Sequence, residues 1–224
     1  MPWRKTPMWI SLGGAWLALH AGYVNAFGYL STHRAGLTHV TGQATRIATE
    51  LGNGRFEDAL TALLLVSWFF FGAALSGLLI PRTELTRKGP RYAVALLFEA
   101  ALLAVATVLL HAGHDWAINF VAVGAGMQNG LASSYAGAVV RTTHVTGIVT
   151  DLGVMLGHAL RRSRPERQQV TLLLGLLTSF LAGGVLGALA LPALNEWSLL
   201  VPAATLSLSA LGYWLRINAN SDDN

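Results

Sequence analysis

Thr38-His39-Val40-Thr41-Gly42 returns 105 residues later as Thr143-His144-Val145-Thr146-Gly147. The match extends to both sides, because Gly22-Tyr23-Val24-Asn25 precedes the first copy and Gly126-Met127-Gln128-Asn129 precedes the second. A match that spreads over half a chain with only small gaps indicates an internal duplication.

The duplication continues downstream, where the stretch from Phe70 to Gly77 parallels the stretch from Phe180 to Gly187. We therefore predict two related halves, internal repeat 1 at about 8–110 and internal repeat 2 at about 115–216, within one domain over 1–224.

The composition is that of a membrane protein. The chain is 53% hydrophobic and 12% charged, whereas soluble domains carry about 25% charged residues. A net charge of +4 would suit nucleic acid, but the basic residues cluster between apolar stretches, which is how membrane proteins orient themselves. We expect the lipid bilayer as a partner and no nucleic acid. The absence of cysteine excludes disulfides and thiolate chemistry.

The apolar stretches predict an all-α integral membrane protein with six transmembrane helices. They lie near 8–30, 58–80, 91–110, 115–137, 168–190 and 196–216. The two His-Val-Thr-Gly segments, near 38–53 and 143–159, contain charged residues and are expected to be re-entrant segments or half-helices. Six spans place twelve of the fifteen basic residues on the side of both termini, whereas eight spans would divide them eight to six. The positive-inside rule favours six spans and cytoplasmic termini.

Each half then crosses the membrane three times, so the second half is inverted relative to the first. Two inverted three-helix repeats with non-spanning segments are a known transporter architecture. Irregular backbone at membrane depth is tolerated only when it is buried in protein or lines a wet cavity.

These motifs also resemble a known family. Ala21-Gly22-Tyr23-Val24-Asn25-Ala26 with His39-Val40-Thr41-Gly42, and Arg141-Thr142-Thr143-His144-Val145-Thr146-Gly147, are similar to the YoaK-like family of bacterial membrane proteins, domain of unknown function 1275. The resemblance covers roughly 10–215 and implies a multi-pass protein of the inner (plasma) membrane, without an activity. Family members often carry Asp where this chain has Asn25, and Tyr where it has His144.

The repeated segments are the candidate site. Thr38 or Thr143 would cap the start of a half-helix, and an exposed helix N-terminus attracts anions. The predicted substrate-binding residues are Asn25, His39, Thr41, Thr45, Asn129, His144, Thr146 and Thr150. The alternative is close packing, because Thr, Ser and Gly are also common at interfaces between membrane helices.

Three other groups are candidates. Arg46 and Asp151 occupy aligned positions and are expected to form a salt bridge across the pseudo-two-fold axis, either as a structural clamp or as a gate. Glu99, in the middle of an apolar helix, is a candidate for proton coupling, with a neutral, hydrogen-bonded carboxyl as the alternative. His111 and His114 beside Asp115 are expected to be solvated, so we predict no metal site, and no cofactor motif is present.

We interpret the chain as a small-solute secondary transporter or channel-like permease, not an enzyme. An anion is the favoured solute, and the small size of one chain leaves a homodimer open. One alternative is an intramembrane enzyme using His39, His144 and Asp151. The other is a structural or signalling membrane subunit with a dry interface between its halves.

Overall fold

The computed structural model describes residues 7–31, 35–80, 90–135, 142–161 and 165–219. In these ranges the chain consists of helices and short connections, and it contains no strand. This confirms the all-α class. Of the basic residues used to predict the orientation, those within 1–6, 32–34, 81–89, 136–141 and 162–164 lie outside the described residues.

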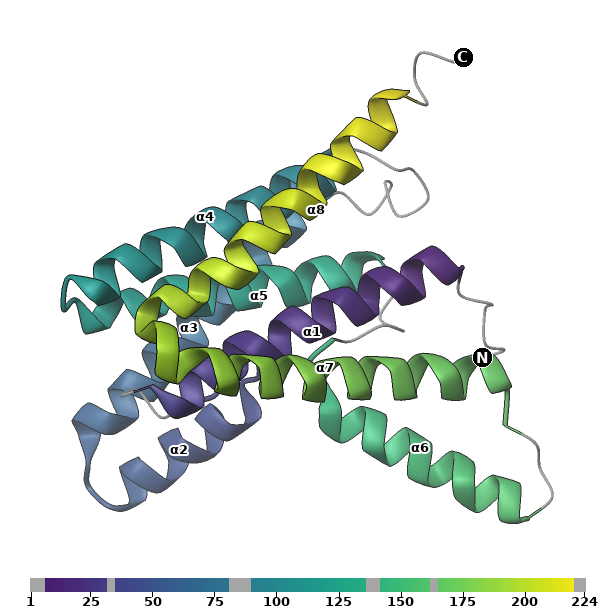
Figure 1. Cartoon of the computed structure of the whole chain (residues 1–224). Helices are drawn as coiled ribbons and strands as arrows, with labels where there is room; N and C mark the ends of the chain where they lie inside the picture. The colour runs from purple at the N-terminus through teal and green to yellow at the C-terminus, as the bar shows by residue number, and fades with distance from the viewer. Residues whose placement is uncertain (1–6, 32–34, 81–89, 136–141, 162–164, 220–224) are drawn as a thin grey trace.

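Among the described residues the fold has six long helices and two shorter ones (Figure 1). Each predicted span overlaps one of the long helices, and each His-Val-Thr-Gly segment contains the start of a shorter one. The elements are α1 (Met8–Leu30), α2 (Thr41–Gly52), α3 (Phe56–Leu79), α4 (Arg91–His111), η2 (Asp115–Ala117), α5 (Ile118–Tyr135), α6 (Val145–Leu160), α7 (Arg167–Leu194), η3 (Asn195–Leu199) and α8 (Leu200–Ala219).

By length and apolar composition, three helical stretches could cross a membrane. They are α3, α4 and the continuous run from Arg167 to Ala219, which comprises α7, η3 and α8. Only 22% to 44% of their most apolar windows is buried inside the protein. Most of their apolar surface therefore faces outward, as a lipid-facing helix requires.

Helices α1 and α5 do not meet this criterion of length and apolar composition, and their position in the bundle allows a more polar composition. Every residue of α5 from 121 to 128 is buried, as is α1 from His20 to Asn25. A helix enclosed by other helices does not meet lipid, so it can carry polar side chains such as His20, Asn25 and Gln128. That α1 and α5 cross the membrane, which would bring the number of crossings to six, therefore stays a prediction.

Two close helix pairs connect the halves. In the α1–α7 pair, a Cβ on Gly22 would overlap the carbonyl oxygen of Phe180, and one on Gly183 would overlap that of Leu19. Figure 1 shows these two helices side by side.

The α3–α5 pair repeats this arrangement. A Cβ on Gly126 would overlap the carbonyl oxygen of Phe69, and one on Gly72 would overlap that of Val123. The first helix of each half thus packs on the second predicted span of the other half. These contacts match Gly72 with Gly183, one residue away from the alignment that the sequence suggested.

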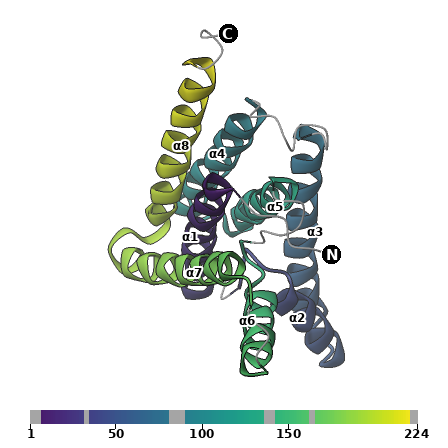
Figure 2. The ribbon, with the colours of Figure 1, turned by 90° about the vertical axis from the view of Figure 1, so that its right-hand side faces the viewer.

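The two shorter helices extend away from this bundle like arms. We call residues 35–52, with α2, the first arm, and residues 142–160, with α6, the second arm. In Figure 1 the first arm lies near the end of the bundle where α1 finishes, and the second arm lies near the opposite end, where α1 begins. The view in Figure 2 has α6 in front and α4 paired with α8 on the far side from the arms.

Candidate functional site

The first arm begins with buried, non-helical backbone. Residues Ala35 to Thr38 are all buried, and the amide of Ala35 donates to the carbonyl of Gly28 over 2.8 Å. Asn25 on α1 supplies the acceptor that a regular helix would have provided. Its Oδ1 accepts from the amides of Leu37 at 3.1 Å and of Thr38 at 3.4 Å. The Asn25 side chain therefore compensates for the break in the helix, since buried amides require partners.

Asn129 on α5 joins the two arms. Its Nδ2 donates to the carbonyl of Thr38 over 3.3 Å and to that of Ala125 over 2.9 Å. Its Oδ1 accepts a hydrogen bond from the hydroxyl of Thr143 in the second arm. We call Asn25, Thr38, Asn129 and Thr143 the polar junction. The predicted equivalence of the two asparagines is reflected in this shared cluster.

Three buried side-chain oxygens of the two arms, one of them in the junction, have no hydrogen-bond partner among the described residues. They are Oγ1 of Thr38 in the junction, Oγ1 of Thr142 and Oε1 of Gln43. The amide of Gln43 donates to the carbonyl of Gly36 over 3.1 Å, which fixes the orientation of its side chain. An unsatisfied buried polar atom costs about 1–3 kcal/mol, so each of these oxygens favours a water or a polar solute beside it.

The four threonines predicted to line the site lie outside the junction. Thr41, Thr45, Thr146 and Thr150 are exposed on α2 and α6. The hydroxyl of Thr45 donates to the carbonyl of Thr41, and that of Thr150 donates to the carbonyl of Thr146. Their four-residue spacing serves local bonding to the preceding turn. Asn25 and Asn129 are thus brought together, but not with these threonines.

The predicted helix caps are also absent. Val40 stands at the N-cap of α2 and His144 at that of α6, and neither start has a side-chain cap. Thr143 instead bonds Asn129. The sequence missed this role because the capping pattern of a threonine does not show which neighbouring helix competes for its hydroxyl.

The two histidines have different surroundings. His39 is half-buried, and its Nε2 lies 3.4 Å from the hydroxyl of Tyr29. Burial lowers the pKa of His39 below its ordinary value, because desolvation disfavours the charged ring. His144 is exposed, and its ring covers Gly147, where a Cβ would overlap it. The glycine of the second motif therefore makes room for the histidine.

The predicted salt bridge between Arg46 and Asp151 is not formed in the described structure. A guanidinium nitrogen of Arg46 lies 3.9 Å from Oδ1 of Asp58 on α3, and Asp151 is exposed on α6. The prediction was wrong because the arms point to opposite ends of the bundle (Figure 1), which separates residues at equivalent positions.

Glu99 is buried on α4, with 3% of its surface exposed, and its Cγ faces Gly124 on α5. Its mid-helix position is therefore buried inside the protein, and its role in proton coupling stays a prediction. Within the described residues, no group of three or more His, Cys, Asp or Glu side chains is placed to hold a metal ion.

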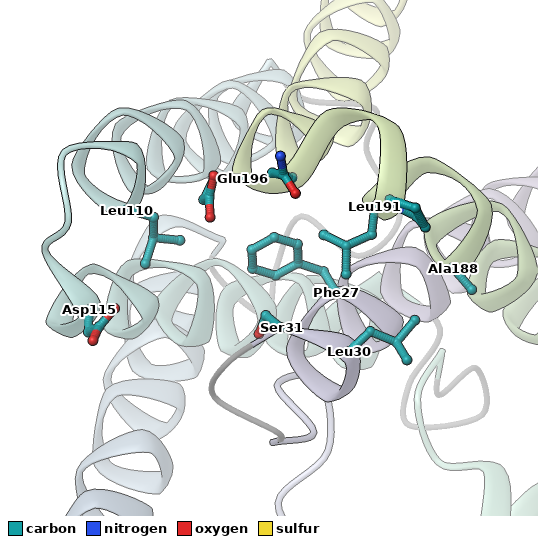
Figure 3. Close-up of a pocket in the computed structure, with 10 residues that line it drawn as sticks. Phe27, Leu30, Ser31, Leu110, Asp115, Ala188, Leu191 and Glu196 are labelled. Atoms are coloured by element: carbon teal, nitrogen blue, oxygen red, sulfur yellow. The ribbon is translucent and has the colours of Figure 1, made fainter.

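A cavity that the sequence did not predict opens at the end of the bundle (Figure 3). This end cavity has a volume of about 560 Å³. Figure 3 shows Phe27 near its centre, with the carboxylates of Asp115 and Glu196 on one side and Leu191 and Leu30 on the other. No repeated motif contributes to it, so the repeat analysis contained no signal for it.

A comparison with known families identifies the chain. Residues 13–212 match the family described as "Protein of unknown function (DUF1275)". The chain belongs to this family. The predicted resemblance is thereby confirmed. No curated protein and no solved structure matches the chain.

Proposed function

We propose that this DUF1275 protein is a small-solute permease of the bacterial inner membrane, with six crossings, both termini cytoplasmic and two inverted three-helix repeats. The observation that carries the proposal is the polar junction. Buried, non-helical backbone from the first arm and a hydroxyl from the second arm meet on one side chain, Asn129. Interrupted helices meeting at a repeat interface are typical of substrate sites in secondary transporters.

The glycine contacts support the inverted repeats. Gly22 and Gly126 each approach a phenylalanine carbonyl of the other half. In the same two helix pairs, Gly183 and Gly72 approach carbonyls of α1 and α5. The ends of the bundle are consistent with an even number of crossings, because α1 begins and α8 finishes on the same side in Figure 1.

The unpartnered oxygens favour a permease over a sealed structural subunit. In a dry interface the hydroxyls of Thr38 and Thr142 would stay without a hydrogen bond in a low dielectric, which raises the free energy of the folded protein. Close packing of the two halves does not require buried hydroxyls at these positions. The enzyme alternative needs His39, His144 and Asp151 in one place. His39 packs against Tyr29, whereas His144 and Asp151 are exposed on the second arm.

The experiment is cysteine accessibility, for which the cysteine-free chain is a ready background. Thr143→Cys in proteoliposomes should react with a small, membrane-impermeant methanethiosulfonate reagent, since a solute path wets the junction. Gly113→Cys, in the exposed turn after α4, should react from outside only. Leu78→Cys, on the exposed apolar surface of α3, should stay unreactive in lipid.

An unreactive Thr143→Cys protein that is folded, with the two controls behaving as expected, would favour the sealed subunit and contradict the permease. Reaction of Gly113→Cys only from the side of the termini would instead overturn the orientation.

A further inference from the structure

We propose that the end cavity binds a small organic cation with an apolar body, and that it is the outward-facing entrance for the solute. Ligand binding depends on the cavity alone, whereas a role of the cavity as an entrance rests on the proposed function. The cavity also corrects the favoured charge of the solute, which the helix N-termini had suggested to be negative.

The size and the walls of the cavity suit a small ligand. A volume of about 560 Å³ lies within the range of ligand sites, which is about 300–1,000 Å³, and such sites combine apolar walls with a few polar groups. Phe27, Leu30, Leu191 and Pro192 provide the apolar surface.

The described residues that line the cavity include two acidic side chains, Asp115 and Glu196, and no lysine, arginine or histidine. His111 lies outside this lining, with Nδ1 4.0 Å from Oε2 of Glu196 and its ring 4.9 Å from that of Trp197.

Helix ends of both polarities lie at the cavity. The lining contains residues from the C-terminal turns of α1, α4 and α7, namely Leu30, Leu110 and Leu191. It also contains Asp115 and Asn195, the first residues of η2 and η3, which lead into α5 and α8. Because a helix C-terminus carries a partial negative charge and an N-terminus a partial positive one, these ends oppose one another, and the preference for a cation rests on the two carboxylates.

The local backbone holds Glu196 in place. Pro192 lies in the last turn of α7, and Asn195 has φ 47°, a left-handed conformation that is uncommon outside glycine. This turn reverses the chain into η3, and the hydroxyl of Tyr23 donates to the carbonyl of Ser198 over 3.0 Å. The carboxylate is therefore carried by a short helix that is anchored to α1.

The cavity is also close to the polar junction along α1. Phe27 faces the cavity, and Asn25, two residues earlier, binds the first arm. Phe27 packs in one cluster with Ala35 and Leu37, which are the buried residues of that arm. Phe27, which lines the cavity, thus belongs to the same buried cluster as the non-helical segment of the first arm.

The test uses three probes of similar shape on the protein in lipid nanodiscs. They are phenethylammonium, the neutral 2-phenylethanol and the anion phenylacetate, with binding measured by calorimetry. We expect phenethylammonium to bind most tightly. The double variant Asp115→Asn, Glu196→Gln should weaken it about tenfold, because it removes both carboxylates. Glu57→Gln, which removes an exposed carboxylate on α3, should leave binding unchanged.

Equal binding of phenylacetate, no binding of the cation at millimolar concentration, or an unaffected and folded double variant would each overturn the proposal. Cation binding with an unreactive Thr143→Cys would retain the binding site and remove the permease. Loss of the preference for the cation, together with a reactive Thr143→Cys, would remove the binding site and retain the permease.

Discussion

The first and second arms contain the same five residues, at 38–42 and 143–147, and pack in different ways. In the first arm, Thr38 is buried and α2 lies along α3. In the second arm, His144 is exposed and α6 packs on α7, and each arm helix has one buried residue, Gln43 in α2 and Ile148 in α6. What the arms share is a hydrogen bond to an asparagine of the core, not a common environment. A repeated motif therefore predicts a repeated attachment point but not a repeated surface.

In the helix pairs of the core, by contrast, the repeated sequence gives repeated packing. The α1–α7 and α3–α5 pairs use glycines at matching positions and meet matching carbonyls. Close approach of two backbones leaves little freedom, so sequence similarity there fixes the packing. Substitutions in the similar pairs and in the dissimilar arms should therefore differ in their effects.

The largest effect is expected in the helix pairs. Gly22→Ala and Gly126→Ala should each reduce the free energy of unfolding by about 3 kcal/mol, because the new Cβ would overlap a backbone oxygen that no rotamer change can move. The measurement is thermal unfolding in detergent. If the halves are equivalent, the two losses should agree within about 1 kcal/mol.

Gly13→Ala is the matched control. Gly13 lies on α1 with no atom near the position of its missing Cβ. Alanine there should be neutral or stabilise the helix by up to about 1 kcal/mol. A Gly22→Ala protein that is as stable as the control would contradict the close pairing of α1 and α7.

A smaller effect should separate the two asparagines. Asn25→Leu leaves the buried amides of Leu37 and Thr38 without an acceptor, which should cost about 2–3 kcal/mol and loosen the first arm only. Asn129→Leu should cost about 1–2 kcal/mol and loosen both arms, since it removes the bonds to Thr38 and Thr143. Hydrogen exchange of α2 and α6 distinguishes these outcomes.

Asn25→Asp serves as the conservative control, because a carboxylate oxygen still accepts from both amides. It should retain the slow exchange of the first arm that Asn25→Leu loses. Faster exchange in α6 but not in α2 for the Asn129→Leu protein would show that the junction does not join the arms.

The sequence predicted the helices and the two asparagines because these depend on local patterns. Apolar runs locate α3, α4 and α7, and the repeat places Asn25 and Asn129 at equivalent positions. It did not predict that Thr41 and Thr146 are exposed, since spacing on a helix defines a face but not what that face contacts. The end cavity was missed because Phe27, Asp115 and Glu196 come from three separate elements, α1, η2 and η3.

A more local loss is expected in the second arm. Ile148 packs with Leu172, Leu173 and Leu176. Ile148→Ala should cost about 2 kcal/mol and raise hydrogen exchange in α6 without lowering the global unfolding temperature. Ile47→Ala, at a half-buried position of α2, is the comparison, and we expect less effect there because Gln43 also holds that arm. Equal loosening of both arms would contradict the asymmetry.

The smallest effect concerns the charges of the arms. Arg46 and Asp58 have side chains that are 32% and 52% exposed and lie 3.9 Å apart, so the pair should contribute less than about 1 kcal/mol. Arg46→Gln, Asp58→Asn and Asp151→Asn should each change the unfolding free energy by no more than that. The swap of Arg46→Asp with Asp151→Arg should equal the sum of the single changes, because residues without a shared contact do not couple. Recovery of stability in the double variant would mean that the arms meet in a second conformation. In that case their present difference would be one state of a symmetric pair, and the opposite ends of the bundle would exchange roles as a permease opens to each side.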